Sequence, residues 1–418
     1  MAAVGTSFGA DQPRTDFDVS TYDVTVEYQP DSQQLHGVAE ISGTATGSLE
    51  TLTFGLRGPT ARSVAVDGTA AKSFAHSGTE DLVVVPVKTV AAGDEFNVRI
   101  EYDGKPGDGW FRTDTGGATS FEGDTVGWFP THLLAHDKAD FRLTATVPPG
   151  WSAVSIGREE SSPAGTFRWA EPDVDPAHIA VSIDRFTIDR SRLADGTPVV
   201  DAYQDGLAEA TRPLAKRLPD ILDFLSGKFG DYPFEAAGNV FVQVNNDAPA
   251  TAPQTRPVFL GAGNKQFMNL DAVVHEQAHQ WYGVTATPSS GADDCLAECF
   301  ASYATWLWGE AKDGVDLDAR YRAQIEAEKE NPDFWAPLYT PGENPGINEY
   351  TKGPLALHAL RMRIGDPAFF RLLKQWPAEH HGYATWPQFE AFAAKVSGAD
   401  LTGFFQAWFR GSTIPAAE

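Results

Sequence analysis

Apolar and polar residues follow two different periods along this chain, and the change comes near residue 195. Before it, short segments alternate between apolar and polar residues and are separated by Gly, Pro and Asp; they cover residues 22–28, 37–42, 82–85, 96–102, 141–147 and 178–183. Alternation of this kind is typical of half-buried strands. The pattern therefore predicts an antiparallel β-sandwich or saddle for residues 1–192.

Beyond residue 195 the apolar residues recur at helical spacing. The predicted helices cover residues 214–229, 269–283, 293–309, 316–330, 354–364, 367–375 and 386–396, and strands are expected at 199–203 and 239–244. Residues 190–196 have the composition of a linker. We therefore predict an α+β protein whose second domain, residues 193–418, is mainly helical.

Composition sets limits on the class of protein. A chain of 418 residues is longer than a single domain with one hydrophobic core usually is, so two domains are expected. Its 42% of hydrophobic residues suffice to form two cores. The net charge of −25 disfavours nucleic acid and anionic membranes as partners. Two cysteines cannot form a disulfide scaffold, and no segment has the apolar length of a membrane span or the pattern of a leader peptide. A cytoplasmic protein acting on a peptide or small molecule is expected.

One short motif carries candidate chemistry. His275 and His279 stand four residues apart around Glu276, and Glu298 follows after eighteen further residues. Two histidines at this spacing share one face of a helix and can hold one metal ion. With Glu298 as third ligand, tetrahedral zinc keeps a fourth position for water, which is typical of a catalytic site. A core helix with hydrogen-bonded histidines would leave both glutamates unexplained.

These residues also carry a resemblance to a known family. Residues 275–283 (His-Glu-Gln-Ala-His-Gln-Trp-Tyr-Gly), the spacing to Glu298 and residues 350–353 (Tyr-Thr-Lys-Gly) resemble the gluzincin aminopeptidases, among them aminopeptidase N and leukotriene epoxide hydrolase. The resemblance implies a β-sheet domain followed by a thermolysin-like catalytic domain that uses Zn²⁺. It also implies that Tyr350 stabilises a tetrahedral intermediate; a buried tyrosine with a satisfied hydroxyl is the alternative.

The charges of the motif suggest a mechanism. Glu276 can take a proton from the attacking water and return it to the leaving group. Asp293 stands where the family has an acidic residue before the glutamate ligand, which implies a hydrogen-bonding partner for a ligand; a helix N-cap is the alternative interpretation.

The chain departs from the family where aminopeptidases hold the α-amine of their substrate. The family's amine-binding glutamate falls at Ala252, and a second amine-binding residue falls near Ser120 or Glu122. Because an ammonium group buried without its carboxylate costs several kcal/mol, we expect specificity that does not depend on a free α-amine. Asp247 in a shifted loop is the alternative anchor.

A second departure flanks the predicted glutamate ligand. Cys295 and Cys299 replace a tryptophan and a glycine of the family pattern. As small residues they could reshape the wall of the substrate pocket, which would make Cys299 a substrate-binding residue. As a thiolate, one of them could instead compete for zinc.

Three functions are compatible with these residues. The first is zinc-dependent hydrolysis of a peptide or amide bond without a need for a free α-amine. The second is a small-metabolite reaction on the same scaffold, such as epoxide opening or cyclisation in specialised metabolism. The third is a non-catalytic zinc-containing binding protein, which would need neither Glu276 nor Tyr350.

Overall fold

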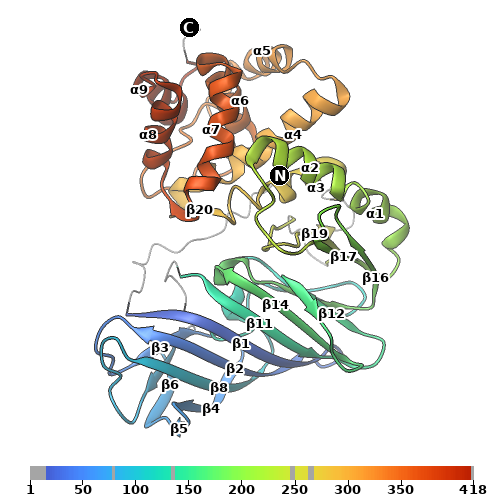
Figure 1. Ribbon diagram of the computed structural model, residues 1–418, viewed down its shortest axis with the longest axis vertical. Coiled ribbons are helices and arrows are strands. Elements are labelled where there is room, and N and C mark those ends of the chain that lie inside the picture. Colours follow the sequence, from blue (N-terminus) through green and yellow to red (C-terminus); the bar gives the residue numbers. More distant parts are fainter. Residues whose placement is uncertain (1–15, 78–80, 133–136, 245–249, 262–267, 416–418) are drawn as a thin grey trace. The chain divides into compact units, whose positions relative to one another are not determined.

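The computed structural model describes residues 16–77, 81–132, 137–244, 250–261 and 268–415. These residues form two compact units (Figure 1). The sheet unit contains the described residues up to 215 together with those of the segment 234–268, and the helical unit contains residues 216–233 and those after 268. The domain boundary expected between residues 192 and 193 stays a prediction.

The sheet unit is built on an eight-stranded sheet with the strand order β13-β14-β11-β1-β2-β8-β4-β5. Apolar and polar residues alternate along its strands, so one face is buried; in β1 the pattern of burial changes at nearly every residue. The strands are β1 (Phe17–Gln29), β2 (Gln34–Ala45), β4 (Thr60–Val66), β5 (Thr69–Ala70), β8 (Glu95–Gly104), β11 (Ala139–Thr146), β13 (Arg158–Glu160) and β14 (Thr166–Val174).

The central pairing of this sheet joins strands that are far apart in sequence. β1 and β11 run parallel, with Tyr22 opposite Phe141 and Val24 opposite Leu143, whereas the other pairs of the sheet are antiparallel. Val24, Phe141 and Leu143 are at most 1% exposed. The core of the sheet unit therefore depends on a contact between its first strand and a strand over a hundred residues later.

Three smaller sheets complete the sheet unit, together with helix α1 (Ala208–Ala215), which packs against β17. One has the order β3-β7-β6, one β12-β15-β10-β9 and one β16-β17-β18-β19. Their strands are β3 (Leu52–Gly55), β6 (Ser73–Ser77), β7 (Asp81–Val85), β9 (Trp110–Arg112), β10 (Ala118–Ser120), β12 (Ser152–Ser155), β15 (Val181–Asp184), β16 (Phe186–Arg192), β17 (Pro198–Gln204), β18 (Ala237–Gln243) and β19 (Val258–Gly261), with short 3-10 turns η1 (Thr125–Gly127) and η2 (Pro176–His178).

The helical unit packs α4 between α3 and α6. The rings of Tyr282 and Phe300 stack at 4.3 Å between their centroids. The elements are α2 (Leu218–Phe229), α3 (Leu270–Ala278), β20 (Ala286–Pro288), η3 (Gly291–Leu296), α4 (Glu298–Trp308), η4 (Gly309–Asp313), α5 (Leu317–Glu328), α6 (Asn348–Ile364), α7 (Asp366–Glu379), β21 (Gly382–Ala384), α8 (Trp386–Ser397), α9 (Thr402–Phe405) and η5 (Gln406–Arg410).

The α+β fold class predicted from the two periods is confirmed, with differences at the ends of several helices. The helix expected at residues 214–229 is two helices, because Pro219 lies in the first turn of α2 and lacks the amide that a continuous helix would use. The helix expected at 293–309 begins as the 3-10 turn η3. α6 begins at Asn348, which places Tyr350 in its first turn.

Membrane-spanning helices are absent from the part of the chain that the structure describes: none of its helices combines the length and the apolar character that a bilayer requires.

Candidate active site

Helix α3 positions the two histidines of the motif. Asn269 caps its start, accepting a hydrogen bond of 2.9 Å from the amide of Ala272. His275 lies in the last turn of α3 and His279 is the residue that ends it. Their Nε2 atoms are 3.1 Å apart. The spacing of four residues thus brings both imidazoles to one point, as predicted.

Helix α4 brings the third candidate ligand to the same point. Glu298 is the first residue of α4, and its Oε2 lies 3.1 Å from His275 Nε2 and 3.5 Å from His279 Nε2. Ligand atoms about 2.1 Å from a tetrahedral zinc ion are roughly 3.3–3.5 Å from one another. The three donor atoms are therefore spaced as one ion requires, and they form a candidate metal-binding group of the described residues.

The contact of Nδ1 of His279 determines which nitrogen of this ring is available to a metal ion. Nδ1 lies 2.9 Å from the carbonyl oxygen of Tyr282, to which an N–H on that atom donates. A neutral imidazole that is protonated at Nδ1 presents a lone pair at Nε2, the atom that faces Glu298. The backbone after α3 thereby prepares His279 for metal binding.

Charge keeps Glu298 ionised. Burial raises the pKa of the Glu298 carboxyl, but while His279 is protonated its positive charge, together with hydrogen bonds from both histidines, outweighs burial, so the pKa lies well below the ordinary value. A metal ion would displace that proton and leave His279 as the neutral ligand. An ionised carboxylate between two imidazoles is the form that coordinates a cation.

Tyr350 lies beside the histidines and stays protonated. Its ring is 5.8 Å from that of His275, between centroids. Burial, and then the carboxylates of Glu298 and Glu349, raise the pKa of its phenol far above the ordinary value. Tyr350 is therefore a neutral O–H donor, which is what an oxyanion requires.

Glu276 lies on α3 between the two histidines and is 8% exposed. Its charge contributes to the raised pKa of His279, which places the carboxylate near that ring. The structure thus brings together His275, His279, Glu298, Glu276 and Tyr350 within the helical unit.

Asp293 makes other contacts. Its carboxylate accepts hydrogen bonds from the hydroxyl of Ser290 at 2.6 Å and from the amide of Trp386 at 2.8 Å. Asp293 thus ties η3 to the start of α8. A role as partner of a metal ligand stays a prediction.

The residues predicted to bind the substrate amine lie in the sheet unit. The carboxylate of Glu122 accepts hydrogen bonds from the amide of Ala252 at 2.8 Å and from the hydroxyl of Thr251 at 2.6 Å, and it pairs with Nδ1 of His178. The Ser120 hydroxyl is buried and accepts from the amide of Val181 at 2.9 Å. Asp247 lies outside the described residues.

His178 was not predicted from the sequence to be a functional residue. Its imidazole pairs with the carboxylate of Glu122 and affects the charge that this carboxylate presents. Burial lowers the pKa of His178, but the charge of Glu122 and the hydrogen bond with it outweigh burial and raise the pKa above its ordinary value. When His178 is protonated, its imidazolium and the Glu122 carboxylate form a buried ion pair whose charges cancel. Only the contact itself, between residues 56 positions apart, reveals this pairing.

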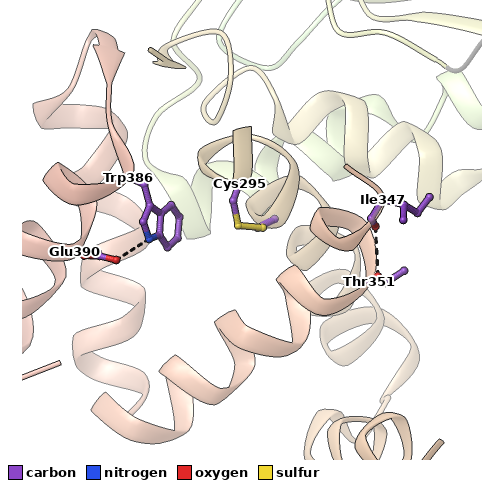
Figure 2. The surroundings of a disulfide bond; sticks show 6 residues. Cys295, Ile347, Thr351, Trp386 and Glu390 are labelled. Carbon is purple, nitrogen blue, oxygen red and sulfur yellow. Dashed lines mark hydrogen bonds between the residues drawn. A yellow bond between two sulfur atoms is a disulfide. The ribbon is translucent and has the colours of Figure 1, made fainter. Parts of the chain in front are cut away.

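The two cysteines of the helical unit are joined in a disulfide (Figure 2). The disulfide overturns the alternative in which one cysteine binds zinc as a thiolate. A sulfur in a disulfide is not a thiolate, so neither cysteine competes for a metal ion. Cys295 and Cys299 are 1% and 0% exposed. A role of Cys299 in substrate binding stays a prediction.

The Lys-Gly pair after Tyr350 has a packing role. The Lys352 ammonium is buried and donates to the carbonyls of Trp335, Ala336 and Gly411 at 3.1, 2.8 and 3.2 Å. Burial lowers the pKa of Lys352 to about 8. Lys352 thus joins the start of α6 to two segments of the helical unit, which holds Tyr350 in place.

Comparison with known proteins finds a sequence relative and several similar structures. No family model matches the chain. Over 241 residues the chain is 24% identical to aminopeptidase N of Lactococcus lactis subsp. lactis; the alignment covers 53% of this chain but only 26% of that protein, about a quarter of its length.

Solved structures match almost the whole chain. An M1 zinc metallopeptidase from Deinococcus radiodurans has a TM-score of 0.85 at 24% identity, covering 99% of this chain and 98% of that one. A mutant of that enzyme bound to a Tyr-Ser-Ala substrate (TM-score 0.85) and a two-domain M1 mutant bound to L-arginine (TM-score 0.86) match at 23% identity, each with 99% of both chains covered. The chain has the fold of two-domain M1 zinc metallopeptidases, and the resemblance seen in its motifs is confirmed.

Proposed function

We propose that this chain is a zinc-dependent metallopeptidase in which His275, His279 and Glu298 hold the ion. The observation that carries the proposal is the convergence of their three donor atoms at 3.1–3.5 Å from one another. When bound, zinc supplies a Lewis acid that polarises a carbonyl and makes water acidic near neutral pH.

Two side chains perform the proton and charge chemistry. Glu276 accepts a proton from the attacking water and passes it to the nitrogen of the leaving amine. Tyr350 donates its O–H to the oxygen of the attacked carbonyl as negative charge develops there. Because Tyr350 is held as a neutral phenol, it keeps this donor over the whole working range of pH.

A peptide is the substrate class that the similar proteins favour. The matched M1 structures include one bound to a Tyr-Ser-Ala substrate and others bound to the single amino acids L-tryptophan and L-arginine. We therefore place peptide or amide hydrolysis ahead of epoxide opening, cyclisation or non-catalytic binding for this chain.

We propose further that the substrate's free α-amine is not essential. Ala252 supplies no carboxylate where the family has its glutamate, and the neighbouring carboxylate of Glu122 is already neutralised by His178. A substrate ammonium gains little from a carboxylate whose charge is balanced and whose oxygens accept protein hydrogen bonds.

Paired substrates test both parts of the proposal. The purified protein is assayed for bound zinc and then with aminoacyl and N-acetyl-aminoacyl fluorogenic amides, before and after removal of metal by a chelator and its replacement. We expect one zinc per chain, activity that returns with zinc, and similar kcat/KM for each free and blocked pair. Absence of zinc overturns the metallopeptidase, whereas cleavage restricted to free amines overturns only the statement on the α-amine.

A cytoplasmic location belongs to the proposal as well. Fractionation of the producing cells, with immunodetection of the chain, is expected to place it with cytoplasmic markers; recovery from an extracytoplasmic fraction contradicts this.

A further inference from the structure

The Cys295–Cys299 disulfide closes a five-residue loop around the candidate ligand Glu298. Cys295 belongs to η3 and Cys299 to the first turn of α4, and their Cα atoms are 4.7 Å apart. Glu298 therefore lies inside the covalent loop, one residue from its end. A change in this bond acts first on the backbone that carries Glu298.

The start of α4 has no capping side chain. Ala297 occupies the N-cap position and has no side chain that could accept a hydrogen bond from the first turn. Alanine is among the weaker residues at this position, where the side chain of Ser, Thr, Asp or Asn would accept a hydrogen bond from the first turn and stabilise the helix end. At this helix start the disulfide takes the place of a capping side chain.

The disulfide also touches the helix that carries Tyr350. Gly353 lies one turn after Tyr350 on α6, and a β-carbon there would collide with Cys299 Sγ and lie only 2.9 Å from its Cβ. Figure 2 shows the disulfide with the start of α6, at Ile347 and Thr351, and the start of α8, at Trp386 and Glu390, in its surroundings. Cys299 thus lies between the candidate ligand and the helix of the candidate oxyanion donor.

Breaking the bond changes the space that the sulfurs need. Two separate thiols cannot approach each other as closely as two bonded sulfurs. Both cysteines are fully buried, and on the side of α6 the backbone of Gly353 packs so closely against Cys299 that its sulfur cannot move in that direction. The start of α4 must therefore shift when the thiols form, and Glu298 shifts with it.

Resting on the proposed function, we infer that the Cys295–Cys299 disulfide is a positioning element of the metal site: it holds Glu298 at the distance from His275 and His279 that one ion requires. Reduction takes two electrons and two protons from two thiol groups of a reductant, which become one disulfide, and leaves Cys295 and Cys299 as thiols. Because Glu298 shifts when the bond is broken, reduction would weaken metal binding. Disulfides are rare in reducing compartments, and those that occur there are usually regulatory.

Zinc affinity of three forms of the full chain tests the inference. These are the oxidised protein, the protein reduced with a phosphine that does not bind zinc, and Cys295→Ala/Cys299→Ala. Intact mass and thiol labelling first establish the state of the cysteines, and a chromophoric chelator then gives the zinc Kd. We expect a loss of affinity of roughly 10–100-fold in the last two forms, as when an outer partner of a metal ligand is removed. Reoxidation restores the affinity of the reduced wild type only.

A second variant separates positioning from general stability. Leu307 lies near the other end of α4 and is 1% exposed, so Leu307→Ala lowers the melting temperature through a cavity. We expect its zinc Kd to remain that of the wild type. An unchanged Kd after proven reduction, an equal loss of affinity in Leu307→Ala, or thiols that do not form the bond under mild oxidation each overturns the inference. An oxidised protein that binds no zinc overturns the proposed function instead.

Discussion

The candidate groups of the helical unit and those of the sheet unit differ in how far apart along the chain they lie. His275, His279 and Glu298 fall within one short stretch and meet at 3.1–3.5 Å. Glu122 meets His178 across 56 residues and Ala252 across 130. The first arrangement follows from helix geometry and was predictable, whereas the second depends on how distant strands and loops pack.

The two regions also show what makes a carboxylate available. One carboxylate oxygen of Glu298 lies close to the Nε2 atoms of two histidines. Together these three donor atoms can bind one cation. Glu122 receives two hydrogen bonds and an ion pair from the protein itself. A carboxylate whose partners are all internal supports the fold, and one that converges with other ligands can act in chemistry.

The sharpest test of the helical region is Glu276→Gln, which keeps the shape of the side chain and removes the base. We expect kcat to fall by roughly 10²–10⁴-fold, since that is what a general base contributes. Zinc content, measured by atomic emission, should stay at the wild-type value because Glu276 is not among the three ligands. Activity within tenfold of wild type would mean that another group moves the proton.

Tyr350→Phe tests the oxyanion donor and is expected to have the next largest effect. Removing one donor of this kind lowers kcat by roughly 10²–10³-fold and leaves KM nearly unchanged. Tyr321→Phe is the matched control, since Tyr321 is also partly buried but belongs to α5. Equal losses in both variants would assign the effect to packing.

Glu122→Gln tests whether the sheet region takes part in recognition. We expect KM to change by less than about threefold, well under the 1.4 kcal/mol of a tenfold effect, and equally for free and N-acetylated substrates. A rise in KM confined to free-amine substrates would show that Glu122 binds the amine after all. It would also remove the contrast drawn between the two regions.

An effect on stability and not on activity is expected from Glu171, a buried residue of β14 that contacts Gln254. Its carboxyl accepts from Gln254 Nε2 at 2.9 Å, and burial raises its pKa to about 7. A carboxyl whose pKa is raised in the folded state gives stability below its ordinary value of about 4.5, and this stability is lost as pH rises through about 7.

Glu171→Gln removes that dependence. Between pH 5 and pH 8 the free energy of unfolding of the variant should fall less than that of the wild type, by at most about 3 kcal/mol. Urea unfolding at several pH values measures the difference. Parallel curves for the two proteins would show that Glu171 is ionised in the folded state.

Sequence spacing predicted the candidate metal site because every step was local: two histidines at i and i+4 on α3, and a connection of eighteen residues, with β20 and η3, to Glu298 at the start of α4. It missed the disulfide although Cys295 and Cys299 have the same spacing of four residues, because spacing brings two sulfurs near each other without determining whether they bond. Alternation predicted strands β1, β2, β7, β8, β11 and β15 of the sheet unit, but not β4 or β14 of the eight-stranded sheet. The parallel pairing of β1 with β11 was not predicted, since alternation determines which face of a strand is buried but not its neighbour.

That parallel pairing has a consequence for synthesis on the ribosome. Strand β2 emerges directly after β1 and covers one of its edges, but the other edge waits for β11, more than a hundred residues later. Throughout that interval a long strand exposes unpaired amide and carbonyl groups beside its apolar side chains, and such an edge recruits other chains. Nascent chains stalled before residue 139 should therefore bind chaperones strongly and release them once residue 146 has left the exit tunnel.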